Sequence, residues 1–333
     1  MKIGVVGLGY WGPNLVRNFS AAEKVESVVA CDVDQRRLQS VGKKFPTAVL
    51  EPDIKRLFSD DSIEAVAIAT PVSTHFHLAK EAMENGKHVL LEKPLAATTA
   101  EAEYLVNLAI GKGLVLMVDH TFIYTGAVRK MRQLIDDGEI GRVSYFDSVR
   151  VNLGLFQHDV NVVWDLATHD ISIMHYLVHE RPVSVAAFGS AHYNGHEDVA
   201  YVVVNFNDGL MAHFHVNWLA PVKVRQILIG GTKKMIMYDD VEPSEKVKVY
   251  DKGVTAATRE GIYDTLIQYR TGDMYAPHLD GAEALSLLCS NFVGSIARET
   301  SPETDGNAGL EVVRILEAAD KSLKNHGALV TLD

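Results

Sequence analysis

Short apolar runs and helix-like segments alternate along the first third of the chain. Apolar runs bounded by turns are typical of buried strands, and apolar residues every three or four positions are typical of helices. The predicted strands are Ile3–Val6, Val25–Cys31, Ala65–Ala69, His88–Leu91 and Leu114–Val118. The helices predicted between them are Gly12–Ala21, Asp34–Lys43, Val72–Asn85 and Thr99–Ile110. This alternation predicts an α/β domain with a doubly wound parallel sheet, covered on both faces.

The pattern changes after about Asp119, where predicted strands follow one another without helices between them. They are Val143–Val151, Val183–His192, Val199–Phe206, Leu210–Trp218, Val222–Ile229, Lys234–Tyr238 and Lys246–Tyr250. Asn207-Asp208-Gly209 predicts a hairpin turn between two of them, because Asn, Asp and Gly accept positive φ. Such a series favours a mainly antiparallel sheet. The helices predicted in this part are Val162–Val178, Ala282–Ala297 and Gly306–Leu323.

The length and the pattern together predict two domains. The 333 residues exceed one typical domain of roughly 100–200 residues, and 47% apolar residues supply a core and exclude a disordered chain. We predict a dinucleotide-binding Rossmann domain over residues 1–119 and an α+β domain over residues 120–333.

Charge and cysteine content narrow the partners. The formal net charge is −11, so we expect neither nucleic acid nor an anionic membrane as a partner. Cys31 and Cys289 are far apart and form no disulfide framework or zinc-binding CxxC pair. The amino terminus lacks a signal-peptide pattern, and no run reaches the roughly 20 apolar residues of a membrane span. We expect a soluble cytoplasmic protein.

A glycine-rich turn follows the first predicted strand. In Gly7-Leu8-Gly9-Tyr10-Trp11-Gly12, the first glycine allows a tight turn, the second admits a pyrophosphate and the third allows close packing. Asp32 ends the second strand 20 residues after Gly12, where a carboxylate binds the adenosine ribose and repels a 2′-phosphate. The loop predicts NAD as cofactor. Arg36 and Arg37 nearby leave NADP open, and a turn kept for packing alone is the structural alternative.

Further candidates follow two later strands, at the edge that faces the ligand crevice of a doubly wound sheet. Glu92-Lys93-Pro94 comes directly after one strand, and a lysine there can stabilise an alkoxide. Thr70-Pro71 follows another, with His75 in the next helix. We count Glu92, Lys93, Thr70, Pro71 and His75 as cofactor candidates. A surface lysine paired with Glu92 is an equally good interpretation of the spacing.

Asp165 and His169 form a second candidate pair. They are four residues apart in a helical pattern, so they share one face of the helix. A carboxylate that orients an imidazole is a plausible general base. A helix-stabilising ion pair and half of a metal site are the alternatives, since His175 and His179 repeat the spacing. The zinc-protease motif HExxH is absent, and alcohol oxidation needs no metal, so we expect none.

These motifs together resemble the Gfo/Idh/MocA oxidoreductase family over essentially the whole chain. The resemblance rests on the glycine turn, Ala69-Thr70-Pro71, Glu92-Lys93-Pro94, the Asp165/His169 pair and a late helix beginning near Thr304-Asp305-Gly306. It implies that Lys93, Asp165 and His169 are catalytic and line the nicotinamide–sugar site. It also implies that the second domain binds substrate and uses a large open-faced sheet in homodimers or homotetramers.

A narrower resemblance concerns the nucleotide-sugar branch of that family. It rests on Gly9–Asn14, Asn152–Gln157, Asp159–Asn161 and Trp164–Leu166. It implies NAD-dependent oxidation of the 3-hydroxyl of a UDP-N-acetylhexosamine, either UDP-N-acetylglucosamine or its uronate, which feeds amino-sugar synthesis for lipid A or O-antigen. The substrate candidates are Arg150, Asn152, Gln157, Asn161 and Arg225, the two arginines as phosphate ligands.

Two alternatives to that activity stay open. One is an NAD(P)-dependent free-sugar or inositol dehydrogenase, or a 3-ketosugar reductase. The other is a dinucleotide-binding regulator that has kept the fold and lost the chemistry.

Overall fold

The computed structural model describes residues 1–154, 160–257 and 266–332, in two compact units. Unit 1 comprises Met1–Thr125 and Ala282–Arg314, and unit 2 comprises Gly126–Gly281 and Ile315–Asp333. The sequence analysis placed one boundary after residue 119 and assigned everything beyond it to the second domain. The return of residues 282–314 to unit 1 has a packing cause, since the ring of Phe292 contacts that of Phe19 in the core of unit 1.

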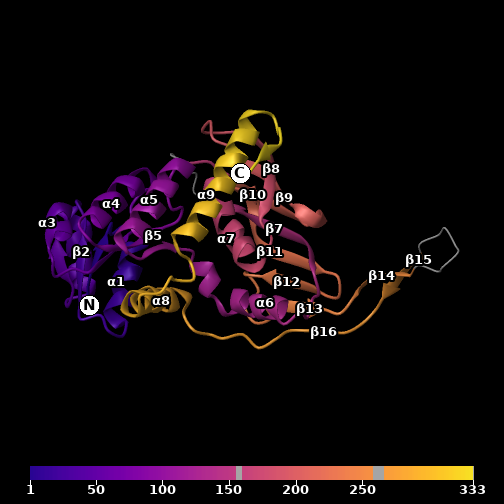
Figure 1. The fold of residues 1–333 in the computed structure, drawn as a ribbon, viewed down its shortest axis with the longest axis horizontal. Coiled ribbons are helices and arrows are strands. Elements are labelled where there is room, and N and C mark those ends of the chain that lie inside the picture. Colours follow the sequence, from indigo (N-terminus) through magenta and orange to yellow (C-terminus); the bar gives the residue numbers. More distant parts are fainter. Residues whose placement is uncertain (155–159, 258–265, 333) are drawn as a thin grey trace. The chain divides into compact units, whose positions relative to one another are not determined.

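Six parallel strands form the sheet of unit 1, two of which, β2 and β5, are labelled in Figure 1. Their order in the sheet is β3-β2-β1-β4-β5-β6. They are β1 Lys2–Val6, β2 Ser27–Cys31, β3 Val49–Glu51, β4 Ala65–Ile68, β5 His88–Glu92 and β6 Leu116–Asp119. This is the strand order of the doubly wound dinucleotide-binding fold, so the predicted fold of this part is confirmed. The sequence analysis missed β3, a three-residue edge strand whose Val49 and Leu50 are exposed.

Helices cover both faces of this sheet. From β1 the strand order runs one way to β2 and the other way to β4 and β5, so right-handed crossovers put α1 and α4 on opposite faces. The helices of unit 1 are α1 Gly12–Ala21, α2 Gln35–Lys44, α3 Ile54–Ser59, α4 Val72–Glu84, α5 Thr99–Lys112, the 3₁₀ turn η1 Thr121–Tyr124, and α8 Ala284–Arg298. Helix α9, Gly306–Lys324, runs from unit 1 into unit 2.

A mixed, mainly antiparallel sheet forms unit 2. Its strand order is β16-β13-β12-β11-β7-β10-β9-β8-β17, and only β7 and β10 pair in parallel among these described strands. The hairpin predicted at residues 207–209 is confirmed as the 3₁₀ turn η3, with positive φ at Asp208 and Gly209. The strands are β7 Val143–Leu153, β8 Pro182–Ser190, β9 Val199–Phe206, β10 Met211–Asn217, β11 Leu219–Gly231, β12 Met235–Asp239, β13 Val247–Tyr250, β16 Met274–Tyr275 and β17 Val330–Thr331. Strands β14 Gly253–Ala257 and β15 Leu266–Arg270 pair separately.

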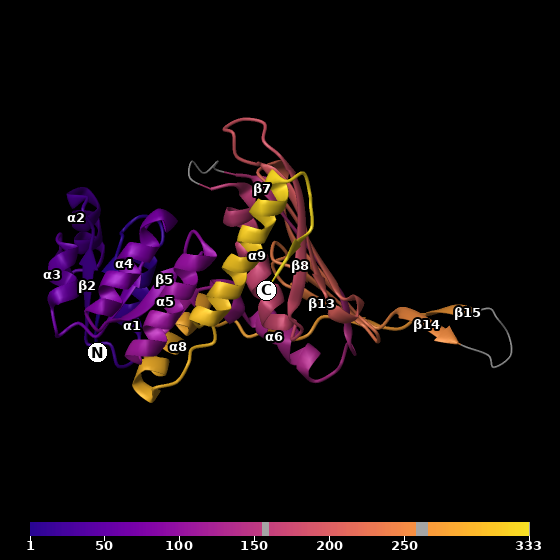
Figure 2. The same cartoon turned by 45° about the horizontal axis from the view of Figure 1, so that its top comes forward.

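The helices of unit 2 lie on one face of its sheet (Figure 2). They are α6 Gly126–Asp136, the π-helical segment η2 Val163–Ala167, α7 Thr168–Leu177 and the second half of α9. Residues of β10 alternate accordingly: Phe214 is fully buried, whereas His213 and His215 lie on the other face. Within the described residues that other face carries no helix, and we call it the open face. The single regular helix predicted at residues 162–178 is wrong at its start, where a π-helical segment precedes α7.

Candidate active site

The glycine turn is built as its spacing predicts. Gly7 has φ of +88°, and a Cβ atom on Gly12 would lie 2.0 Å from the Gly7 carbonyl oxygen. At Gly9 the nearest atom to such a Cβ is 3.9 Å away, so this backbone borders open space. Helix α1 begins after Trp11 without a side-chain cap; Pro13 has no N–H and the N–H groups of Asn14 and Leu15 donate to the Trp11 carbonyl oxygen, so the helix start offers an anion the Gly12 N–H. The turn therefore has room and a donor for a pyrophosphate.

Asp32 is held against this turn at the end of β2. Its Oδ2 accepts the Leu8 N–H at 2.6 Å, and its Oδ1 accepts the Asp34 N–H at 2.8 Å. An ionised carboxylate has about four lone-pair positions, so acceptor capacity remains for ribose hydroxyls. Arg37 Nη1 lies 3.7 Å from Oδ2 and pairs with Asp32. A negative charge at this position fits NAD better than its 2′-phosphorylated form.

Glu92-Lys93-Pro94 and Thr70-Pro71 lie at the carboxyl ends of neighbouring parallel strands: Glu92 ends β5, and Thr70-Pro71 follows β4. His75 joins the two segments: its Nδ1 lies 2.8 Å from the Pro94 carbonyl oxygen and its Nε2 lies 2.9 Å from that of Thr70. Burial lowers the pKa of His75. The prediction that His75 contacts the cofactor finds no support here, because both ring nitrogens are directed at backbone carbonyls. The ring instead ties the segment of Lys93 to that of Thr70.

Glu92 has an acidic neighbour that the sequence analysis did not single out. Asp119 ends β6 as Glu92 ends β5, and the two residues are paired in the sheet register. Burial raises the pKa of both carboxyl groups. Glu92 Oε2 accepts the Lys93 N–H at 3.0 Å, so this acidic pair adjoins the candidate lysine.

In unit 2, Asp165 and His169 lie where π-helical backbone gives way to α7. Asp165 is within the π-helical segment, and His169 is the second residue of α7. Single π-helical turns are rare in proteins, and those that do occur often lie at functional sites. Lys93 belongs to unit 1, whereas Asp165 and His169 belong to unit 2.

A buried tryptophan holds Asp165. The Trp218 indole Nε1–H donates to Asp165 Oδ2 at 3.0 Å. A Cβ atom on Gly154 would lie 2.7 Å from Trp218 Cδ1 and 3.2 Å from the amide nitrogen of Asn152. Asn152 Oδ1 is buried and accepts no hydrogen bond within the described part of the chain. Unit 2 thus gathers Asp165, Trp218 and a polar Asn152 in one place.

Three other substrate candidates have structural partners. Arg150 is buried and forms two hydrogen bonds with Asp170, of 2.9 and 2.6 Å. Asn161 donates to Glu197 and Asp320, and its Oδ1 accepts two backbone N–H groups at the start of the helical segment. Arg225 donates to Asp240 at 3.3 Å. These contacts give no support to Arg150 or Asn161 as substrate ligands, because their polar groups are already engaged in the interior. Gln157 lies outside the described residues.

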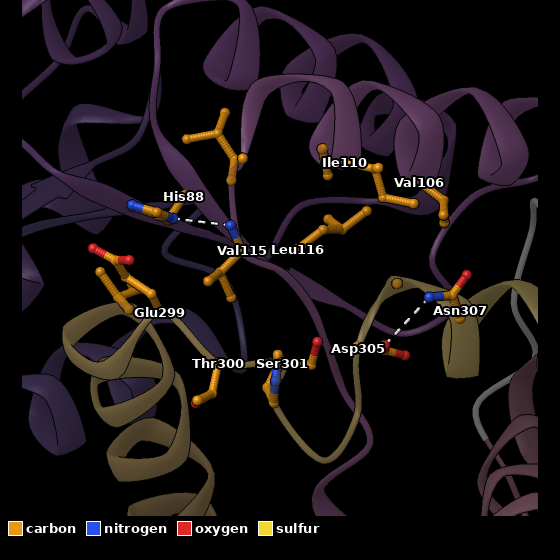
Figure 3. A pocket seen from close by; sticks show the side chains of 16 residues that line it. His88, Val106, Ile110, Val115, Leu116, Glu299, Thr300, Ser301, Asp305 and Asn307 are labelled. Carbon is orange, nitrogen blue, oxygen red and sulfur yellow. Dashed lines mark hydrogen bonds between the residues drawn. The ribbon is translucent and has the colours of Figure 1, made fainter.

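A cavity of about 230 Å³ lies elsewhere in unit 1 (Figure 3). His88 and Leu116, at the amino-terminal ends of β5 and β6, line it together with Glu299 and Asp305. The His88 imidazole Nδ1 accepts the Val115 N–H at 2.9 Å. This cavity is at the opposite edge of the sheet from Lys93 and is therefore separate from the cofactor site.

The described residues 1–154, 160–257 and 266–332 contain no group of three or more His, Cys, Asp or Glu side chains placed to hold a metal ion. They also contain no helix with the length and apolar character needed to cross a membrane.

Two family models match most of the chain. Residues 1–120 match the oxidoreductase family with an NAD-binding Rossmann fold, and residues 128–237 match the C-terminal domain of the same family, GFO/IDH/MocA. The chain belongs to the Gfo/Idh/MocA family. It is an oxidoreductase, and its Rossmann domain binds NAD. The residues fit that cofactor: Gly9 leaves space for the pyrophosphate and Asp32 retains acceptors for the ribose.

Individual relatives extend over the full length. UDP-N-acetylglucosamine 3-dehydrogenase of Acidithiobacillus ferrooxidans is 26% identical over 317 residues, covering 94% of either chain. Its solved structure has a TM-score of 0.82 at 25% identity and covers 98% of both chains. Myo-inositol 2-dehydrogenase of Thermotoga maritima is 24% identical, covering 97% of this chain and 96% of its own. Levoglucosan dehydrogenase, solved with NADH and L-sorbose, shares the fold with a TM-score of 0.84 at 21% identity, covering 100% and 99%.

Sequence reasoning missed Asp119, Trp218 and the pairing of Asp170 with Arg150. Asp119 carried a usable signal, since it ends a buried strand beside the one that ends in Glu92. Trp218 carried none, because nothing in local spacing connects it to Asp165.

Proposed function

We propose that this chain oxidises the 3-hydroxyl of a UDP-N-acetylhexosamine with NAD, in a route that supplies amino sugars for lipid A or O-antigen. The choice of substrate rests on the similarity, over 94% of the chain, to a UDP-N-acetylglucosamine 3-dehydrogenase. Asn152 supports a polar ligand in unit 2, since its buried amide oxygen lacks a donor within the described residues. UDP-N-acetylglucosamine and its uronate are the two forms to be compared.

The proposed chemistry assigns one role to each of three residues. NAD, when bound, supplies the two-electron acceptor for oxidation of the alcohol. Neutral His169 takes the proton of the 3-hydroxyl, and the Lys93 ammonium stabilises the negative charge that develops on that oxygen. Asp165 orients His169 or binds a neighbouring sugar hydroxyl, with its own position set by the Trp218 indole.

Substitution of His169 by Ala tests the base. Positioned acid–base catalysis typically contributes 10²–10⁴-fold, so we expect His169→Ala to lower kcat by about that factor. NADH absorbance with UDP-N-acetylglucosamine gives the rate, and calorimetric titration with NAD confirms that the cofactor still binds. His179→Ala, an exposed histidine in the same region, is the matched control and keeps its rate. A kcat for His169→Ala near that of the unchanged protein contradicts the assignment.

A free-sugar or inositol dehydrogenase is the second candidate function. The full-length similarity to myo-inositol 2-dehydrogenase favours it. Turnover of myo-inositol without turnover of UDP-sugars in the same absorbance assay would reverse the order of the two candidates. Tight NAD binding with no turnover of any sugar would point to a dinucleotide-binding regulator instead.

The open face of the unit 2 sheet is the surface we propose for self-association into a homodimer or homotetramer. Phe188 and Tyr201 are 59% and 44% exposed there, and they are paired in the register of β8 and β9. Tyr201 stacks on His215 of β10 with ring centroids 4.4 Å apart, so an aromatic patch crosses three strands. Exposed apolar patches of this kind mark interaction sites.

A further inference from the structure

Two carboxyl groups, that of the buried Asp119 and that of the half-buried Glu92, lie at the carboxyl edge of the unit 1 sheet. Glu92 and Asp119 are the last residues of neighbouring parallel strands and are partners in their register. Their side chains are within hydrogen-bonding reach of each other. Asp119 is 2% exposed, so water does not solvate it.

A buried oxygen of this pair has no donor among the residues that the structure describes. Thr121 Oγ1–H donates to Asp119 Oδ1, and the Lys93 N–H donates to Glu92 Oε2. Asp119 Oδ2 is buried and receives no donor from the residues that the structure describes. Two ionised carboxylates offer only acceptors to each other, whereas one protonated carboxyl supplies the missing donor. A buried oxygen without a partner is costly, so the geometry calls for a proton between the two groups.

The charged and titratable surroundings agree with a single negative charge on the pair. Lys93 follows Glu92 directly and favours one ionised carboxyl. Cys289, on α8, is another titratable group affected by the pair: burial together with the charge of Asp119 raises the pKa of its thiol. That thiol therefore adds no second charge at neutral pH.

We propose that Glu92 and Asp119 share one proton, and that this hydrogen-bonded pair fixes the Glu92–Lys93 backbone, which makes Asp119 a positioning residue for Lys93. The link is short: Asp119 holds the Glu92 carboxyl, and that carboxyl accepts the backbone N–H of Lys93. The role of Lys93 rests on the proposed function, whereas the shared proton does not.

Infrared spectroscopy tests the shared proton without any substrate. A protonated carboxyl has a C=O stretch separate from that of a carboxylate, and ¹³C labelling of Asp or Glu assigns it. We expect this band at neutral pH in the unchanged protein, and its loss in both Asp119→Asn and Glu92→Gln, because the remaining carboxyl then ionises. Asp61→Asn, at an exposed aspartate of the same unit, retains the band. Absence of the band from the unchanged protein, or its survival in both variants, overturns the proposal.

Kinetics of two Asp119 variants test the positioning. Asn keeps a hydrogen bond to Glu92, whereas Leu removes it at similar size. We expect near-normal kcat in Asp119→Asn and a loss of up to about 100-fold in Asp119→Leu, the cost of a small misplacement of a catalytic group. Equal losses in two variants that both fold and bind NAD contradict the positioning role. If no sugar is turned over at all, the proposed function fails while the infrared result still decides the proton.

Discussion

At the scale of residues, Gly12 and Gly9 of the cofactor turn differ in whether the surrounding protein leaves room for a side chain. Gly12 has no room for a side chain, because its Cβ would lie 2.0 Å from a backbone oxygen. Gly9 has room for a side chain when no cofactor is bound, since the nearest atom to a Cβ placed on it is 3.9 Å away. Gly12 is therefore needed for the fold, and Gly9 for the ligand.

That difference predicts opposite effects of two alanine substitutions. Gly12→Ala forces backbone apart, so we expect a loss of about 1–3 kcal/mol or more in the free energy of unfolding. Gly9→Ala should leave stability close to normal and weaken NAD binding, because the methyl group occupies the space of the pyrophosphate. Denaturant unfolding and calorimetric NAD titration separate the two. Normal NAD affinity in Gly9→Ala would show that the phosphates do not approach this backbone.

The role of a residue could be predicted from the sequence where it depends on neighbouring residues in the chain. The glycine turn, Asp32 and the Glu92-Lys93-Pro94 segment depend on sequence neighbours within one strand–turn–helix unit, and the structure places them accordingly. The ion pair of Arg150 and the side-chain N–H donation of Asn161 depend on partners 20 or more residues away. An arginine on a strand looks the same in sequence whether it faces solvent or a buried aspartate, so its burial could not be predicted.

At the scale of elements, helix α7 is fastened to the unit 2 sheet beside His169. Asp170 on α7 accepts from Ser148 and from Arg150, both on β7. Both members of the ion pair are 2% exposed. Hydropathy predicted a helix here, but its π-helical start could not be predicted, since apolar spacing alone does not distinguish one π-helical turn from α-helix.

Removal of one member of this ion pair should destabilise unit 2. Asp170→Asn leaves the guanidinium of Arg150 buried without its counter-charge, which typically costs about 3–5 kcal/mol. Asp136→Asn breaks the partly exposed pair with Arg132 and should cost at most about 1 kcal/mol. Denaturant unfolding of the two variants measures both. A loss below about 1 kcal/mol in Asp170→Asn would mean that the pair does not anchor the helix.

At the scale of the whole molecule, the open face of the sheet leads to a prediction about assembly. Light scattering coupled to gel filtration should give the mass of a dimer or tetramer. Phe188→Asp combined with Tyr201→Asp puts charges into the aromatic patch and should reduce that mass to one chain. Asp61→Asn combined with Asp53→Asn, at exposed positions in unit 1, is the control. A monomer mass for the unchanged protein would contradict the proposed association.

The path of the chain through its two units restricts how the protein can have evolved by recombination. Unit 1 is closed by α8 and the first turns of α9, which follow every strand of the nine-stranded unit 2 sheet except β17 along the chain. A gene fragment ending at residue 125 would leave Phe19 without Phe292 and expose apolar surface. A single crossover between two genes, at any point between the two segments of unit 1, would join residues 1–125 to an α8 from another protein and break this core. We therefore expect the two units to have been inherited together.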